Sequence, residues 1–566
     1  MPRHRFSWVK EPALLAALAC GACGLWLVYI MPYGLFSGDE GVKLVQSLTL
    51  LENDWQSAAI PYRGADLDPG GEHLPLRPPF VWQHEDAWYG IYSMLFTSAG
   101  ALAWEAGGLR AVFLLSWLGA ATALVLLARL AKRAVGPKWA TAVVVATAVA
   151  SPLLLYGTLN FEHTWACAAV LGCLGLLARP GSTHRVWTAA GVLLGLGAAI
   201  RPELYAFSAG VIAFSLVLWG WRWETLRRLV WVGTGAVLVG GIDVISKAMM
   251  FGSFHPNLQV SGLPPTTYQI NFTRLVPLEI QGLGLVLLSG ALLIGWLPAM
   301  GKVSRLAKWM AGVVLVLTWA RLAWLALAAV TPSVFSDTRT IIGLFAATPL
   351  AVLGLLRGAK TDRETGGSEL GAACGAAAIG FVVAVVAILI PGFIGGLELG
   401  SRYLLPAVPL LLVAGADHLR GQEGKPYRRV AIATCLPLVA LSLQATFENG
   451  ISTYLIRQHT SRLLSGVEET GVEDVVTRHF WIPQLLAPLY FEKRIYLYPD
   501  DELLRRMLEK GRDRVVGVDL MVGIFSGDQV KVTRDRVVMK PGHVMSYRLW
   551  PSGQSESKSI DISEGP

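Results

Sequence analysis

Charged residues are scarce in this sequence. Asp, Glu, Lys and Arg make up 16% of the 566 residues, whereas soluble domains carry about 25%. Hydrophobic residues make up 53% of the chain, and the mean hydropathy is +0.49. These values exclude an ordinary soluble domain and predict an integral membrane protein.

Cysteine is also rare, and no cysteine lies in a long polar segment. The six residues fall inside or beside apolar runs: Cys20, Cys23, Cys167, Cys173, Cys374 and Cys435. A disulfide framework needs cysteines in outer polar segments, so we expect none. Cys20-Gly-Ala-Cys23 has the spacing of a redox motif, but within an apolar run it is better interpreted as small packing residues.

The sequence lacks a concentrated basic face, although its net charge is +8. Its Lys and Arg residues recur in short clusters between apolar runs, which is the pattern of membrane orientation rather than of nucleic-acid binding. No nucleic-acid partner is therefore predicted. The sequence also has no Gly-rich phosphate loop after a predicted strand and no solenoid repeat.

Apolar runs long enough for membrane helices, which need about 20 residues, dominate the chain. We predict thirteen spans, at about 12–33, 110–130, 139–158, 164–179, 187–201, 204–221, 229–250, 282–299, 309–330, 341–357, 370–391, 402–416 and 429–447. The fourth, fifth and twelfth runs are short, which leaves them open to being tilted, broken or re-entrant. The first run follows a basic N-terminus but is too long for a signal peptide, so it is interpreted as an uncleaved helix.

The segments between the runs alternate in charge. Basic clusters follow every second run, so the positive-inside rule places them and the N-terminus in the cytoplasm. The opposite set, 34–109, 159–163, 251–281, 331–340 and 392–401, has far fewer cations. An odd number of spans puts the tail after residue 447 outside as well. We therefore expect a protein of the bacterial cytoplasmic (inner) membrane with its C-terminal domain outside.

The tail has a different pattern from the rest of the chain. Short β-rich stretches at 472–478, 494–498 and 514–518 and an amphipathic stretch at 501–509 predict strands and a helix. The predicted organisation is a transmembrane domain over 1–447 with a large first outer loop, 34–109, then an extracytoplasmic α/β domain over 448–551. Residues 552–566 are polar and are predicted to be disordered.

Two adjacent carboxylates stand where the first helix leaves the membrane, in Ser37-Gly38-Asp39-Glu40-Gly41. A carboxylate there can act as a general base that takes a proton from a hydroxyl. The simpler alternative is a pair of solvated acids at a helix exit. Adjacent acids point in different directions, and the sequence does not decide which of Asp39 and Glu40 faces a substrate.

Other ionisable residues lie at the predicted outer ends of the helices, where burial is costly and a functional role is the first hypothesis. Glu162 and His163 fill the short turn between the third and fourth spans, with helix capping as the alternative. Arg201 and Glu203 flank Pro202 between the fifth and sixth spans. Arg201 has a planar fork suited to phosphate, and its alternative is an ion pair with Glu203 or another acid.

Three further residues are candidates for substrate binding. His255 lies in the outer loop that Phe251-Gly-Ser opens, and Arg402 and Tyr403 lead from a Gly-rich outer loop into the twelfth span. An arginine at such a boundary suits a lipid-linked phosphate. Asp243 and Lys247 are four residues apart and predict an intrahelical ion pair.

A divalent metal is left open as a cofactor, and no metal site is predicted. His84-Glu85-Asp86 offers suitable ligand types in the first outer loop. However, no tight ligand spacing is present, and a wet polar loop explains the same residues.

Together these motifs resemble the GT-C glycosyltransferase superfamily, especially bacterial relatives of dolichyl-phosphate-mannose protein mannosyltransferases. The resemblance covers about residues 12–447. The motifs that carry it are Asp39-Glu40, Phe161-Glu162-His163, Arg201-Pro202-Glu203, Phe251-Gly-Ser with His255, and Gly400-Ser-Arg402-Tyr403-Leu-Leu-Pro406. Each motif is short, and their order along one predicted outer face makes the match specific.

The resemblance implies a polyprenyl-phosphate sugar donor and transfer with inversion on the extracytoplasmic face. It implies that Asp39 is the acidic base and that Arg402, together with Arg201, holds the donor phosphate. Some other branches of the superfamily use a divalent metal. The acceptor is left open among glycan, lipid and protein.

A multi-span transporter or lipid flippase is the main alternative. Transporters often show internal repeats and charges near the middle of the bilayer. In this sequence only Arg321 is clearly deep within a predicted span, and no repeat of halves is visible. A membrane receptor with an outer sensor domain is a third alternative, but it would not need matching charged turns on one side.

Overall fold

The structure is a computed structural model that describes residues 11–78, 80–252, 341, 344–356, 368–389, 402–421, 428–518, 530–539 and 544–551. The chain divides into two compact units. The first, here named the membrane unit, consists of Met1–Tyr33 and Ile91–Arg457. The second, here named the loop–tail unit, consists of Gly34–Gly90 and Gln458–Pro566.

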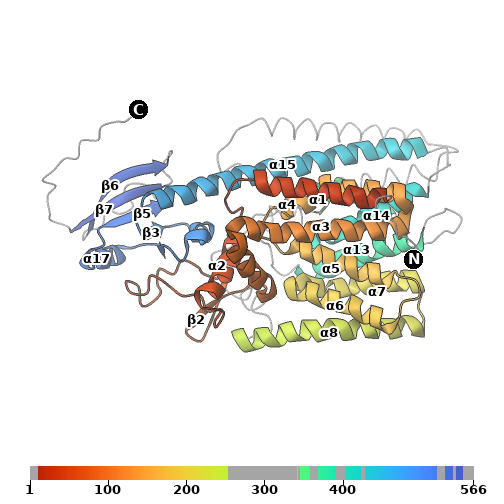
Figure 1. Ribbon diagram of the computed structural model, residues 1–566, viewed down its shortest axis with the longest axis horizontal. Coiled ribbons are helices and arrows are strands. Elements are labelled where there is room, and N and C mark those ends of the chain that lie inside the picture. The colour runs from red at the N-terminus through yellow and green to blue at the C-terminus, as the bar shows by residue number, and fades with distance from the viewer. Residues whose placement is uncertain are drawn as a thin grey trace, which may run out of the picture. The chain divides into compact units, whose positions relative to one another are not determined.

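The membrane unit is built from helices, most of which run side by side as a bundle (Figure 1). Its elements are α1 (Pro12–Ile30), α3 (Met94–Val149), α4 (Leu153–Tyr156), α5 (His163–Leu177), α6 (His184–Ile200), η2 (Pro202–Tyr205), α7 (Phe207–Trp219), α8 (Trp223–Phe251), α12 (Leu344–Ala347), η4 (Pro349–Leu356), α13 (Glu369–Leu389), η6 (Arg402–Leu404), α14 (Ala407–Arg420) and the first part of α15 (Arg428–Glu469). In the described part of the chain, four helical segments are long and apolar enough to cross a membrane: Pro12–Ile30, Met94–Val149, Pro202–Trp219 and Trp223–Met250. The protein is therefore a helical membrane protein.

Helix α3 shows where the sequence prediction needs correction. It begins at Met94, so the predicted outer loop 34–109 ends in helix rather than in loop. Gly108 (φ 62°) and Gly136 (φ 79°) interrupt it in left-handed conformations, and Pro137 follows the second break. The backbone angles at these glycines are not helical, so α3 consists of helical pieces joined at kinks. The predicted spans 110–130 and 139–158 lie on opposite sides of the kink at Gly136, and the second extends past the end of α3 at Val149.

The described helices bear out the predicted runs in part. The runs near 12–33, 164–179, 187–201, 204–221, 229–250, 370–391, 402–416 and 429–447 coincide with helices. The run 341–357 forms the short helices α12 and η4, and the runs 282–299 and 309–330 lie outside the described residues. The count of thirteen spans stays a prediction.

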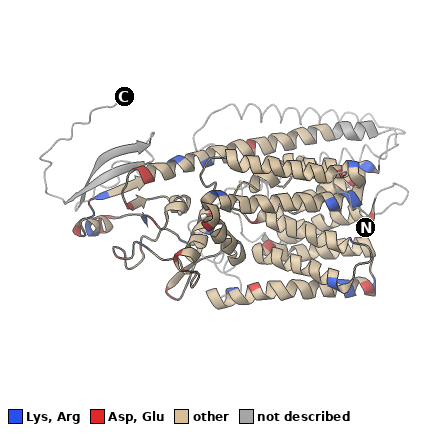
Figure 2. Ribbon diagram, viewed as in Figure 1, with Lys and Arg blue, Asp and Glu red and all other residues tan. Residues whose placement is uncertain are grey.

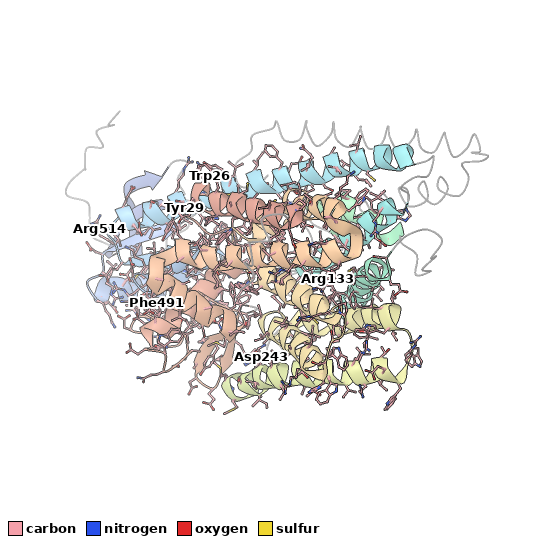
Figure 3. All side chains as sticks on the ribbon, turned by 45° about the vertical axis from the view of Figure 1, so that its right-hand side comes forward. Trp26, Tyr29, Arg133, Asp243, Phe491 and Arg514 are labelled. Carbon is pink, nitrogen blue, oxygen red and sulfur yellow. The ribbon has the colours of Figure 1, made fainter. Side chains whose placement is uncertain are left out.

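Charge and aromatic residues are distributed as a bilayer requires. In the bundle, Lys and Arg gather at one end of the helices, and the middle of each helix is almost free of charge (Figure 2). Trp26 and Tyr29 project outward from α1, and their exposed fractions are 66% and 51% (Figure 3). Such apolar rings on the outer face of a bundle are suited to contact with lipid.

The loop–tail unit combines the first loop with the tail of the chain. Its elements are α2 (Gly38–Glu52), the hairpin of β1 (Val81–His84) and β2 (Ala87–Gly90), then the last turns of α15, β3 (Asp474–Thr477), α16 (Ile482–Leu485), η7 (Ala487–Leu489), β4 (Arg494–Leu497), α17 (Asp501–Glu509), β5 (Arg514–Val518), β6 (Val530–Met539) and β7 (Val544–Pro551). The predicted helix at 501–509 and the three predicted strands are confirmed at these positions.

Five strands form one mixed sheet in the order β4-β3-β5-β7-β6. Strand β3 pairs in parallel with β4 and β5, with Val475 opposite Ile495 on one side and Val516 on the other. Strands β5 and β6 both pair antiparallel with β7. The parallel centre is buried, which explains the unbroken apolar stretches that predicted these strands.

A hydrophobic core joins the two sequence segments of this unit. Leu67 from the first loop is 1% exposed and packs with tail residues that include Val476, Tyr496, Leu503 and Met507. In addition, the Leu497 N–H donates to the His73 carbonyl oxygen at 3.0 Å. The compact units therefore differ from the predicted division at residue 447, because the loop buries its apolar side chains with the tail.

Removing the carboxylate of Asp474 should loosen the central strands. Arg494 donates from Nε and Nη2 to the two oxygens of Asp474 at 2.7 and 2.8 Å, and the Asp474 side chain is 4% exposed. Because Asp474→Asn leaves Arg494 without its buried partner, we expect a loss of about 2 kcal/mol of local stability. Hydrogen exchange of the β3 and β4 amides in the full-length protein measures this loss.

Glu473→Gln is the matched control for that experiment. Glu473 contacts the same arginine, Arg494, but its side chain is 63% exposed, and exposed pairs contribute less than about 1 kcal/mol. Equal exchange in the Asp474→Asn and Glu473→Gln variants would contradict the assignment of Asp474 as the structural partner.

Candidate functional site

The turn that precedes α5 is held in place by Ser116 of α3. The Phe161 N–H donates to the Ser116 hydroxyl at 3.2 Å, and the Thr164 hydroxyl donates to the Ser116 carbonyl at 2.8 Å. Glu162 and His163 are 2% and 1% exposed in this turn. The turn therefore presents a carboxylate and an imidazole inside the bundle rather than to water.

Aromatic rings enclose the imidazole of His163. Tyr156 stacks on it with ring centroids 5.0 Å apart, and Phe161 approaches edge-on at 5.1 Å. Packing on two sides fixes the plane of the His163 ring.

Arg457 supports the same turn and was not singled out by the sequence. It is 1% exposed, and its Nη1 donates to the Thr158 carbonyl oxygen at 2.7 Å. Its guanidinium lies 4.1 Å from the centroid of the Phe113 ring. Arg457 comes after the last apolar run, where an arginine looks solvated, and only the continuation of α15 brings it into the bundle.

Arg201 joins two acidic residues from different parts of the sequence. Its Nη1 donates to Glu162 and its Nε donates to Glu203, each at 2.7 Å. The Arg201 and Glu203 side chains are both 9% exposed. Helix α6 ends at Ile200 because Pro202 cannot continue it, and this break turns Arg201 towards both acids. The structure thus shows the alternative given in the sequence analysis, an ion pair of Arg201 with Glu203 and a second acid.

Arg402 and Tyr403 complete this group, here named the Arg201 cluster: Glu162, Arg201, Glu203, Arg402 and Tyr403. The Arg402 Nη2 donates to the Tyr403 hydroxyl at 2.9 Å. The guanidinium carbons of Arg201 and Arg402 lie 5.4 and 4.9 Å from the centroid of the Tyr403 ring. Two arginines and two glutamates give a formal charge of zero, so the cluster is balanced within a low-dielectric bundle.

In the loop–tail unit the adjacent acids Asp39 and Glu40 have different environments. Glu40 is 0% exposed, and its Oε2 accepts the backbone N–H groups of Phe36 and Ser37 at the start of α2. This contact is the carboxylate half of a capping box. Asp39 is the second residue of α2 and is 9% exposed.

Among the described residues, Asp68, Glu72 and His73 form a cluster with ligand types suited to a divalent cation. Each offers one ligand atom, and these atoms lie within 4.8 Å of one another. Asp68 nevertheless already accepts hydrogen bonds from the Glu72 and His73 backbone N–H groups and the Tyr62 hydroxyl. Burial, followed by the bond to Asp68, raises the pKa of Tyr62, so its hydroxyl stays a donor. These bonds favour a structural turn, and no chemical step is assigned to a metal there.

The remaining sequence candidates are placed as follows. His84, Glu85 and Asp86 form the end and the turn of the β1–β2 hairpin, and they are not part of that ligand cluster. Lys247 donates to Asp243 at 2.7 Å, which confirms the predicted intrahelical pair. His255 and Arg321 lie outside the described residues.

The fold and the paired charges within it define a polytopic α-helical membrane protein. No family model matches the chain, and no curated protein matches it either. Solved structures similar to it include the following three. ArnT from Cupriavidus metallidurans bound to undecaprenyl phosphate has a TM-score of 0.44 at 14% identity, over 96% of this chain and 98% of that one.

The other two are structures of the Archaeoglobus fulgidus oligosaccharyltransferase. The complex with Zn and sulfate has a TM-score of 0.46 at 14% identity, over 89% of this chain and 68% of that one. The oligosaccharyltransferase AglB from the same organism, in complex with an inhibitory peptide and a dolichol-phosphate, has a TM-score of 0.45 at 12% identity, over 91% of this chain and 70% of that one.

Removing the positive charge of Arg201 should destabilise the membrane unit. Arg201→Gln leaves Glu162 and Glu203 buried without their shared cation, and such a loss costs about 3 kcal/mol. We expect the melting temperature of the purified protein in detergent to fall. The double variant Arg201→Gln, Glu162→Gln should recover part of the loss, because one of the uncompensated charges is removed.

Arg227→Gln serves as the control for this cycle. Arg227 pairs with Glu224 at 3.1 Å, but its side chain is 59% exposed, so its removal should leave the melting temperature nearly unchanged. A double variant less stable than Arg201→Gln alone would show that Glu162 does not depend on Arg201.

Proposed function

We propose that the protein is a glycosyltransferase that moves a sugar from a polyprenyl-phosphate donor to an acceptor hydroxyl on the extracytoplasmic membrane face. The observation that carries the proposal is the Arg201 cluster. It gathers residues of three motifs, represented by Glu162, Arg201 and Arg402, into one buried group of charged side chains. Buried charges in a membrane bundle are costly, which makes a functional role the first hypothesis for this cluster.

Arg402 is the residue best suited to hold the donor phosphate. The Nε and Nη1 of Arg201 already donate hydrogen bonds to two carboxylates, so Arg201 supports the cluster rather than binding the phosphate. Arg402 contacts the hydroxyl and the ring of Tyr403, which orient its planar fork. A guanidinium fork can bind two phosphate oxygens at once and stabilise the charge that develops on the departing lipid phosphate.

Asp39 is proposed as the general base. Its carboxylate takes the proton of the acceptor hydroxyl while that oxygen forms a bond to the anomeric carbon. The bond between the anomeric carbon and the phosphate oxygen breaks at the same time, and the polyprenyl phosphate leaves with the electron pair. Attack opposite the leaving group inverts the anomeric centre. Glu40 is less suited to this role because its carboxylate caps α2.

Asp39→Asn should abolish transfer and retain donor binding. An amide cannot take the hydroxyl proton, so we expect turnover to fall about 10²–10⁴-fold. The assay uses purified protein in detergent, a panel of polyprenyl-phosphate sugars and membrane extract as the source of glycan, lipid and protein acceptors. Glu40→Gln is the adjacent control, and its main effect should be on the stability of α2.

The possible results separate the hypotheses. Full turnover in Asp39→Asn, with loss in Glu40→Gln, would move the base to Glu40. If the wild-type protein neither turned over nor bound any such donor, the enzyme proposal would fail. The transporter or lipid flippase hypothesis would then be tested with the same lipids in vesicles.

Arg402→Gln should weaken donor binding. Loss of a charge-assisted pair of hydrogen bonds to phosphate corresponds to a rise in Kd of about 10–100-fold. Arg420→Gln is the matched control: Arg420 lies at the other end of α14 and donates to the Ala134 carbonyl at 3.1 Å. Binding of a fluorescent polyprenyl phosphate measures both variants, and equal affinities would refute the role of Arg402.

A further inference from the structure

Two glycines enclose the proposed base in the first turn of α2. Gly38 and Gly41 are three residues apart, so they lie on one face of the helix. Neither has a positive φ angle, so their backbone conformations are open to any residue. Glycine in a helix is destabilising relative to alanine, and something other than backbone conformation must require it at these two positions.

The requirement is the close approach of Gln484. A Cβ atom on Gly38 would lie 1.7 Å from the Gln484 Oε1, and one on Gly41 would lie 1.8 Å from the Gln484 carbonyl oxygen. Real Cβ atoms essentially never approach other heavy atoms within 3.0 Å. Only hydrogen fits at both positions, and Gln484 thus packs directly on the segment that carries Asp39.

Gln484 is itself firmly held. It lies in α16, is 1% exposed, and has the buried neighbours Leu485, Leu486 and Leu489 along α16 and η7. Helix α2 contacts both of these short helices. Residues 482–489 of the tail therefore form a surface against which the first turn of α2 rests.

We propose that Gln484 is a positioning residue for Asp39, an inference that rests on the proposed function. Asp39 lies between the two glycines, so movement of this turn away from Gln484 displaces its carboxylate. A general base works within about 2.6–3.2 Å of the proton that it takes, and a misplacement of 1 Å can cost about 10²-fold in rate. The tail is then part of the catalytic apparatus, and its removal would disturb the base.

The two glycines make different contacts, and this difference gives the test its specificity. At Gly38 the obstructing atom is the end of a flexible side chain, which Gln484→Ala removes. At Gly41 the obstructing atoms belong to the backbone of residue 484, which no substitution there removes. Gln484→Ala should therefore rescue Gly38→Ala and should not rescue Gly41→Ala.

The experiment measures kcat, the KM for the polyprenyl-phosphate donor, and hydrogen exchange of α2 in the full-length protein in detergent. We expect Gly38→Ala and Gly41→Ala to lower kcat about 10–10²-fold with the donor KM unchanged, and to speed exchange in the first turn of α2. The double variant Gly38→Ala, Gln484→Ala should return to the kcat of Gln484→Ala alone. Gly233→Ala is the control, because that helical glycine has no atom within 4 Å of the added Cβ.

Each result has one meaning. Full kcat in Gly38→Ala, or equal rescue of both glycine variants by Gln484→Ala, would overturn the inference. If exchange follows the expected pattern while kcat does not, the contact exists but Gln484 does not position the base. If the wild-type protein transfers no sugar, the proposed function fails, and exchange still tests the contact. Hydrogen exchange of the β3, β4 and β5 amides identifies a variant that fails to fold. In that case the kcat of Gln484→Ala is used for the kinetic test, because this substitution adds no atoms.

Discussion

The membrane unit depends on one constraint: an arginine buried in an apolar bundle must have anionic partners. Arg201 meets this constraint with Glu162 and Glu203, which come from the turn before α5 and from the start of η2. The hydrogen bond to Glu162 fixes the end of α6 relative to α5. Because Tyr403 faces the guanidinium of Arg201, the start of α14 is tied to the same point. One charge thus sets the positions of three helix ends.

The loop–tail unit depends on a different constraint, the sharing of a core between distant segments. Leu67 of the first loop is 1% exposed because tail residues, among them Val476 and Tyr496, surround it. The start of α2 is likewise defined by residues of the tail at Gly38 and Gly41. The acidic motif therefore has a defined direction only when the tail is folded.

Some residues of the candidate site could be identified from the sequence, and others only from the structure. The sequence identified Asp39, Glu40, Glu162 and Arg201 because ionisable residues stand out beside apolar runs. It left open the choice between Asp39 and Glu40, although Ser37 and Glu40 have the spacing of a capping box, and the structure shows Glu40 in that capping role. Arg457 was missed because its burial follows from the path of α15 and not from its neighbours in sequence.

The sequence by itself determined the class of protein, most of the apolar helices and the short strands of the tail. These features depend on hydrophobic periodicity and helix length, which are properties of neighbouring residues. Only the tertiary structure decided the pairing of Arg201 with two acids and the union of the first loop with the tail in one core. Those features arise from contacts between residues far apart in the chain. The pattern of residues along the sequence does not predict which distant segments will be in contact.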